Sequence, residues 1–178
     1  WHEAVDDELL RNVAFAELVH DFGERAQFMV RENDHGVYIY QTKGSRAIDT
    51  DSHIGAHVPL HATAVGKAYL SSLSEKELQE TLDAIDFTAE TPNTITNQDS
   101  LLDDLEEARN QGYALNEQEK KTGIYAIGVP IQDDKTNETI GAVSLSAPET
   151  RMFDSPLREE VPERLQSVAR VIGLKATY

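Results

Sequence analysis

The chain has 178 residues, of which 32 are acidic and 16 basic, so its formal net charge is −16 at pH 7. This length suits one domain with a sizeable core, and the charge disfavours direct binding to a phosphate backbone. No run approaches the roughly 18 apolar residues of a spanning helix, so we expect a cytoplasmic protein with no membrane contact. The absence of cysteine excludes disulfides and thiolate metal sites.

The acidic surplus has two interpretations. The acids recur on the polar faces of periodic segments and do not gather in one tail. An ordinary acidic cytoplasmic protein would fit. Adaptation to high salt also fits, because dissolved ions screen self-repulsion within a few ångströms, and the sequence favours this halophilic interpretation.

The N-terminal part of the chain predicts a helix followed by a hairpin. Residues 4–20 place an apolar stripe at helical spacing, and Gly23 ends the helix. Residues 26–32 and 36–41 are rich in strand-forming residues, and the polar turn between them predicts a hairpin. A further short strand is predicted at 46–49. The stripe of the helix consists of Val5, Leu9, Val13 and Ala16.

The middle of the chain predicts three helices. The first covers residues 61–72. Ser74 and Glu77 have the spacing of a capping box, which opens the second helix. The third covers residues 98–111, and Gly112 suits its C-terminal cap.

The last third predicts three strands and a final helix. The strands cover residues 113–118, 124–131 and 139–147, and a Ser155–Pro156 pair opens the helix. Pro162 is expected to kink or delay this helix. Hairpins with helices at both ends predict an α+β domain with a mostly antiparallel sheet. The buried stripe of the final helix is predicted as Leu157, Val161, Leu165, Val168 and Ile172.

Residues 59–70 form a helix start that is rich in small side chains. A helix N-terminus presents unpaired amides and a partial positive charge, and small side chains would let an anion reach them. Small residues also let a helix pack tightly on a sheet. The segment by itself favours neither interpretation.

The last two strands each have one face of small residues. Ala142, Ser144 and Ser146 alternate with larger apolar residues, and Ala126 and Gly128 do so in the preceding strand. Two such faces side by side would leave room for a ligand and line it with hydroxyls. A solvent-facing sheet surface would have a similar composition.

Three histidines invite a metal interpretation. His53, His57 and His61 are spaced by four, but Gly55 and Pro59 interrupt any helix that would align them. We expect ordinary polar or capping roles, no metal and no cofactor.

Enzymatic chemistry finds no support in the sequence. No nucleophile elbow or glycine-rich phosphate loop is present. Lys67 lacks the spacing of a phosphate-binding lysine, and residues 117–121 are expected to form a solvated, charged turn. We therefore expect no catalytic residues.

Several motifs occur in an order that resembles the effector-binding domain of IclR-type transcriptional regulators. The resemblance runs from about residue 10 onward, and the ordered set is more specific than any one motif. The motifs cover residues 59–68 (PLHATAVGKA), 91–96, 111–114, 123–130, 142–148 and 173–175.

The resemblance implies a GAF-like fold with a curved antiparallel sheet flanked by helices. It implies a pocket for a small organic effector, typically a carboxylate or an aromatic acid, in a homodimer or tetramer. It also implies a preceding winged helix-turn-helix domain that this chain lacks, so that DNA is contacted only through that domain. Residues 1–22 are then a linker and N-terminal helix, and residues 23–178 the effector-binding domain.

The resemblance also assigns pocket positions. Two are helix-start amides that hold an acidic group, two set the pocket size, and three are polar. Some members have Asp where this chain has Asn116 and Cys where it has Ala126, which leaves the effector open. The assigned residues are Ala64, Val65, Asn116, Ile124, Ala126, Ser144 and Ser146.

The sequence thus predicts a sensor domain that couples metabolite binding to DNA binding. Two alternatives stay open. One is a structural dimerisation domain whose interior is filled by its own side chains, and the other is a GAF-like enzyme.

Overall fold

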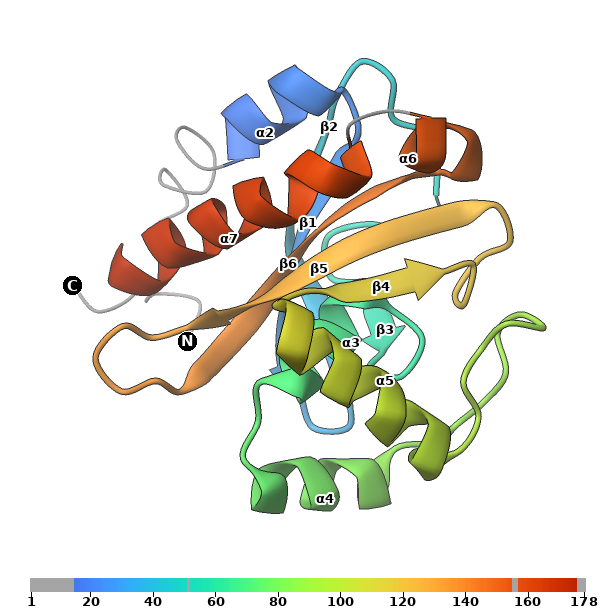
Figure 1. Cartoon of the computed structure of the whole chain (residues 1–178), viewed down its shortest axis with the longest axis vertical. Helices are drawn as coiled ribbons and strands as arrows, with labels where there is room; N and C mark the ends of the chain where they lie inside the picture. Colours follow the sequence, from blue (N-terminus) through green and yellow to red (C-terminus); the bar gives the residue numbers. More distant parts are fainter. Residues whose placement is uncertain (1–14, 51, 155–156, 176–178) are drawn as a thin grey trace.

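The computed structural model describes residues 15–50, 52–154 and 157–175. A six-stranded sheet lies between two groups of helices, α2 and α7 on one face and α3, α4 and α5 on the other (Figure 1). The strands are β1 (Arg25–Glu32), β2 (His35–Lys43), β3 (His57–Pro59), β4 (Ala114–Glu117), β5 (Ile124–Gln132) and β6 (Thr139–Pro148). The helices are α2 (Phe15–Phe22), α3 (Ala64–Ser71), α4 (Glu75–Ala84), α5 (Gln98–Gln111), α6 (Glu149–Asp154) and α7 (Leu157–Lys175).

The sheet is curled and has the strand order β3-β2-β1-β6-β5-β4. Every neighbouring pair is antiparallel. The centre of the sheet joins the N-terminal hairpin to the C-terminal one, because β1 pairs with β6. The predicted α+β, GAF-like fold with a curved antiparallel sheet is confirmed.

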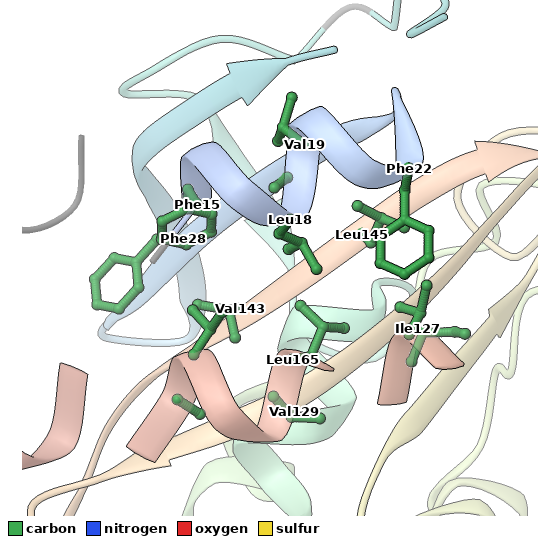
Figure 2. Close-up of a cluster of buried hydrophobic side chains, with 14 of the residues drawn as sticks. Phe15, Leu18, Val19, Phe22, Phe28, Ile127, Val129, Val143, Leu145 and Leu165 are labelled. Atoms are coloured by element: carbon green, nitrogen blue, oxygen red, sulfur yellow. The ribbon is translucent and has the colours of Figure 1, made fainter. Parts of the chain in front are cut away.

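The α2–α7 face of the sheet, here called the dry face, holds a core of buried apolar side chains (Figure 2). In α2 the buried residues fall at helical spacing and point toward β1, β6 and α7. The predicted stripe is wrong at Ala16, which is exposed; its other three residues lie outside the described part of the chain. The buried residues of α2 are Phe15, Leu18, Val19 and Phe22.

Helix α7 covers the same face, and all five residues of its predicted stripe are buried. Pro162 lies inside the helix, which already begins at Leu157, so the proline does not delay it. The predicted Ser155–Pro156 opening falls outside the described residues. No helix within the described ranges has the length and apolarity to cross a bilayer.

The opposite face of the sheet packs against α3, α4 and α5. Local signals place these helices well. The capping box of Ser74 and Glu77 forms, with each residue bonded to the other's backbone amide. Gly112 ends α5 with a φ of 89°, a left-handed conformation that favours glycine.

Three short segments differ from the prediction. Residues 46–49 form no strand. The strand that completes this edge is β3, which pairs with β2 through only three residues. Helix α6 was not predicted, because its six residues carry no capping or periodic signal long enough to identify.

Candidate functional site

A pocket of about 350 Å³ lies on the α3 face of the sheet. It is bounded by the start of α3, residues from all six strands, and two connecting segments that contribute Thr50, Ser52 and Ala56, and Lys120 and Lys121. All seven residues assigned from the sequence line it: Ala64, Val65, Asn116, Ile124, Ala126, Ser144 and Ser146. The structure therefore brings the two sequence-derived features, the helix start and the small strand faces, to one place.

The start of α3 supplies backbone amides to this pocket. Thr63 is the N-cap, and its hydroxyl accepts from the Gly66 amide at 3.1 Å. The amides of Ala64 and Val65 belong to the first turn, so the helix itself offers them no carbonyl partner. Both residues are almost fully buried, and the helix dipole adds a partial positive charge at this end.

Helix α3 approaches the sheet closely because Gly128 lies beneath it. A Cβ built on Gly128 would be 2.5 Å from the Ala64 carbonyl oxygen and 3.1 Å from the Val65 nitrogen. Any side chain here would therefore push the helix away from the sheet. The tight-packing interpretation of the small-residue segment is confirmed, and this packing places Ala64 and Val65 at the pocket. Anion binding by their amides stays a prediction.

The pairing register of the strands determines which side chains line the sheet side of the pocket. Antiparallel partners point to the same face, so paired residues form rows across the sheet. One row joins Asn116, Ala126, Ser146 and Arg25. The small side chains at the centre of this row leave the space that the pocket occupies.

A second row lies one step along the same strands. It joins Gly128 on β5, Ser144 on β6, Gln27 on β1 and Gln41 on β2. Ser144 and Gln27 both line the pocket and are at most 3% exposed. The pocket-facing hydroxyls predicted from alternation are therefore accompanied by a buried carboxamide.

Both polar atoms of the Asn116 side chain form hydrogen bonds with the protein backbone. Its Nδ2 donates to the Ala62 carbonyl at 3.2 Å, and its Oδ1 accepts from the Glu119 amide at 2.8 Å. The residue is 5% exposed. In this arrangement Asn116 joins the loop before α3 to the turn after β4, and both segments border the pocket.

A buried ion group joins α3 to α5 and to the turn after β4. Lys67 of α3 is 1% exposed, and its Nζ lies 2.7 Å from Asp104 Oδ2 and 2.9 Å from Glu119 Oε1. Burial raises the pKa of the Glu119 carboxyl, and the nearby Lys67 opposes this rise. The prediction of a solvated turn is wrong at Glu119, because Lys67 draws its side chain into the interior.

Two lysines lie at the rim of the pocket. Lys120 and Lys121 follow Glu119 and line the pocket, and Lys120 Nζ lies 3.5 Å from Glu90 Oε2. None of the described lining residues is acidic, although the chain has 32 acidic residues. An anion would therefore meet amides, hydroxyls and lysines in this pocket, and no described carboxylate.

The three spaced histidines separate in the structure. His57 stacks on His35 with ring centroids 4.2 Å apart, and His61 Nε2 lies 2.9 Å from the Thr88 carbonyl oxygen. Among the described residues, no three His, Asp or Glu side chains gather as metal ligands would. The positions of these histidines fit the polar roles expected from the sequence.

Residues 10–174 match the family described as bacterial transcriptional regulator IclR C-terminal. The chain belongs to the IclR family. One relative in it, the HTH-type transcriptional regulator XynR of Escherichia coli, is 32% identical over 163 residues. That alignment covers 90% of this chain and 64% of XynR, so the chain spans less than two thirds of this curated relative.

Solved structures have the same fold. The crystal structure of the C-terminal domain of E. coli KdgR has a TM-score of 0.83 at 28% identity, and the match covers 96% of this chain and 99% of KdgR's. A double mutant of the PobR inducer-binding domain from Acinetobacter, in complex with 3-hydroxybenzoic acid, has a TM-score of 0.79 at 24% identity. That match covers 93% of this chain and 98% of the PobR chain.

The IclR resemblance did not identify several residues that line the pocket. A sequence signal for Gln27 does exist, because it is a polar residue at an inward position of an otherwise buried strand. The segment 50–58 has no such signal, because its position depends on the path of a long connection. The additional lining residues are Gln27, Tyr38, Thr50, Ser52, Ala56, His57, Val58, Thr63, Lys120 and Lys121.

Proposed function

We propose that this IclR-family domain is a sensor whose pocket binds a small organic acid. The observation that carries the proposal is the convergence of first-turn amides, strand hydroxyls and rim lysines on one pocket of about 350 Å³. This volume lies within the range of small-molecule sites. A purely structural domain would have no need to leave this space open between buried elements.

The preference for an acid follows from the charges around the pocket. The amides of Ala64 and Val65 would hold the acidic group, and Ser144 and Ser146 would donate hydrogen bonds from the sheet. Lys120 and Lys121 would attract the anion against the repulsion of a chain with net charge −16. Ile124 and Ala126 would limit its size. The 3-hydroxybenzoic acid in the complex with the double mutant of the PobR inducer-binding domain is an acid of this kind.

Signalling would require that the effector bind two conformations of the protein with different affinity. The elements that contact it are well placed for this, since α3 and the 118–123 turn are joined through Lys67 and Glu119. We propose that the change reaches a winged helix-turn-helix domain in a homodimer or tetramer of the full-length protein. DNA would be bound through that domain, in the cytoplasm, and this domain would catalyse no reaction.

A thermal-shift screen of small carboxylates, hydroxy acids and aromatic acids tests the proposal. We expect a subset of acids to raise the melting temperature, with saturation as the acid concentration increases. The Ala126→Trp variant should abolish the shift by filling the pocket. Ser144→Ala with Ser146→Ala should reduce it, whereas Ser100→Ala, a serine-to-alanine change at an exposed position of α5, should retain it. A shift that survives Ala126→Trp and the double change Ser144→Ala with Ser146→Ala would contradict the site.

A further inference from the structure

The side chain of Gln27 is a buried polar group with one atom left to satisfy. Its Nε2 donates to Gln41 Oε1 at 2.9 Å and to Ser52 Oγ at 2.9 Å. A carboxamide nitrogen has two hydrogens, so both are used in these two bonds. The remaining atom, Oε1, can only accept a hydrogen bond, and no described residue donates to it.

Ser144, the register partner of Gln27 on β6, also has a polar atom without a described hydrogen-bond partner. The residue is 2% exposed and lines the pocket. No described residue forms a hydrogen bond with its hydroxyl. Neither Ser144 Oγ nor Gln27 Oε1 is among the side-chain atoms that are both fully enclosed and unbonded. Both atoms therefore face the pocket, where a ligand can reach them.

The register gives the distance from these atoms to the acid site. The Val65 amide lies above Gly128 on β5, Ser144 is one strand farther, and Gln27 is two strands farther. Neighbouring strands are about 4.8 Å apart, so the row from β5 to β1 spans about 10 Å. Hydrogen bonds of about 2.9 Å at both ends bring the two ligand groups to between about 4 and 10 Å apart, depending on their direction, and a carbon chain of four to six bonds, about 5–8 Å long, lies within this range.

We infer that Gln27, with Ser144, selects acids that carry a hydroxyl group four to six bonds from the carboxylate. This inference rests on the proposed function, because it assumes that the carboxylate binds at α3. A hydroxyl can donate to Gln27 Oε1 and exchange a hydrogen bond with Ser144, whereas an unsubstituted acid leaves both atoms buried and unpaired. Sites built to bind a hydroxyl reject the analogue that lacks it for this reason.

Isothermal titration of matched acids tests the inference. The probes are hexanoate with 6-hydroxyhexanoate, and pentanoate with 5-hydroxypentanoate. In the unchanged protein, the hydroxy acid of at least one pair should bind about three- to tenfold more tightly, as one net hydrogen bond predicts. In Gln27→Met, which removes the acceptor and keeps the size, this advantage should fall below about twofold.

Two further variants serve as controls. Ser144→Ala should also reduce the advantage, and because its hydroxyl has no described protein partner, this variant provides a second readout should Gln27→Met fail to fold. Gln111→Met, on the exposed end of α5, should leave the advantage unchanged.

The outcomes separate the two proposals. Equal affinity for both members of each pair, or an advantage that persists in both Gln27→Met and Ser144→Ala, overturns the selection for a hydroxyl while acid binding stands. If none of the four acids binds at millimolar concentration, the inference is overturned, while the proposed acid-binding function is decided by the wider thermal-shift screen.

Discussion

The two faces of the sheet are built differently. On the α2–α7 face, twenty buried apolar residues within the described ranges fill the space between helices and strands. On the α3–α5 face, the apolar cluster is interrupted by buried polar groups, among them Gln27, Lys67, Asn116, Glu119 and Ser144. Lys67, Asn116 and Glu119 have partners within the protein, whereas Gln27 Oε1 and the Ser144 hydroxyl have no described partner. Leaving buried polar atoms unpaired is unfavourable, so these two atoms indicate a use other than stability.

Two neighbouring residues of β6 show the difference between the two faces. Leu145 points into the dry core, and its neighbour Ser144 points into the pocket. Both are almost fully buried, at 0% and 2% exposure. Burial by itself therefore does not tell which residues stabilise the fold, and the partners of each side chain decide it.

The largest expected effect comes from the dry face. Leu145→Ala would remove buried carbon from a packed cluster and leave a cavity there. We expect the free energy of unfolding to fall by about 3 kcal/mol. Denaturant titration followed by circular dichroism measures this, and a loss below about 1 kcal/mol would show that this face is loosely packed.

A somewhat smaller loss is expected on the pocket face from Lys67→Met, because two carboxylates lose their buried partner. Complete burial would make the loss larger, but Asp104 is one third exposed and Glu119 can take up a proton. We expect about 2 kcal/mol at neutral pH and less in acid, from the same titration. A variant as stable as the unchanged protein would contradict a structural role for the ion group.

The pH dependence of this ion group has a definite sign. Burial raises the folded-state pKa of Glu119 above its ordinary value of 4.5. The stabilisation that this shift contributes is complete below about pH 4.5 and is lost as the pH rises through the raised pKa. The stability of the unchanged protein relative to Glu119→Gln should therefore decrease as the pH rises above about 4.5. Parallel pH profiles for the two proteins would show that Glu119 has an unshifted pKa.

The rim lysines should influence binding more than stability. Lys120→Gln with Lys121→Gln would lower acid affinity about threefold at low salt, and the loss should shrink in molar salt. Lys76→Gln with Lys135→Gln removes the same charge from other exposed positions and serves as the control. Equal losses in both double variants would assign the effect to net charge, and not to the rim.

The smallest change in stability is expected at Ser144, which is next to Leu145 in the chain. Ser144→Ala should alter the free energy of unfolding by less than about 0.5 kcal/mol, because its hydroxyl has no described protein partner to lose. Comparison with Leu145→Ala under identical denaturant conditions measures the contrast between the two faces directly. A loss near that of Leu145→Ala would mean that the hydroxyl is part of the packed structure.

Most of the fold could be predicted because its signals are local. The capping box at Ser74, the left-handed Gly112 and the alternation in β6 each act within a few residues. The missed strand β3 depends on pairing with a distant strand, and the predicted strand at 46–49 had no partner to stabilise it. The acidic surplus suggests adaptation to high salt, and this stays a prediction.

The candidate site, too, could be predicted from the sequence only in part. Alternation placed Ser144 and Ser146 on one face, and the IclR resemblance supplied Ala64, Val65 and Asn116. The contact between Lys67 and Glu119 could not be predicted, because these residues are 52 positions apart and meet only through folding. Sequence reasoning therefore identified the groups that face the pocket better than those that hold its walls together.

Nuclear magnetic resonance of the backbone amides tests the central claim most directly. During titration with an acid that stabilises the domain, the Ala64 and Val65 amide signals should move and saturate together. The amide signals of α2 and α7, on the dry face, should stay in place. Saturable shifts confined to α2 and α7, with Ala64 and Val65 unmoved, would contradict the proposal that the acid binds at the start of α3.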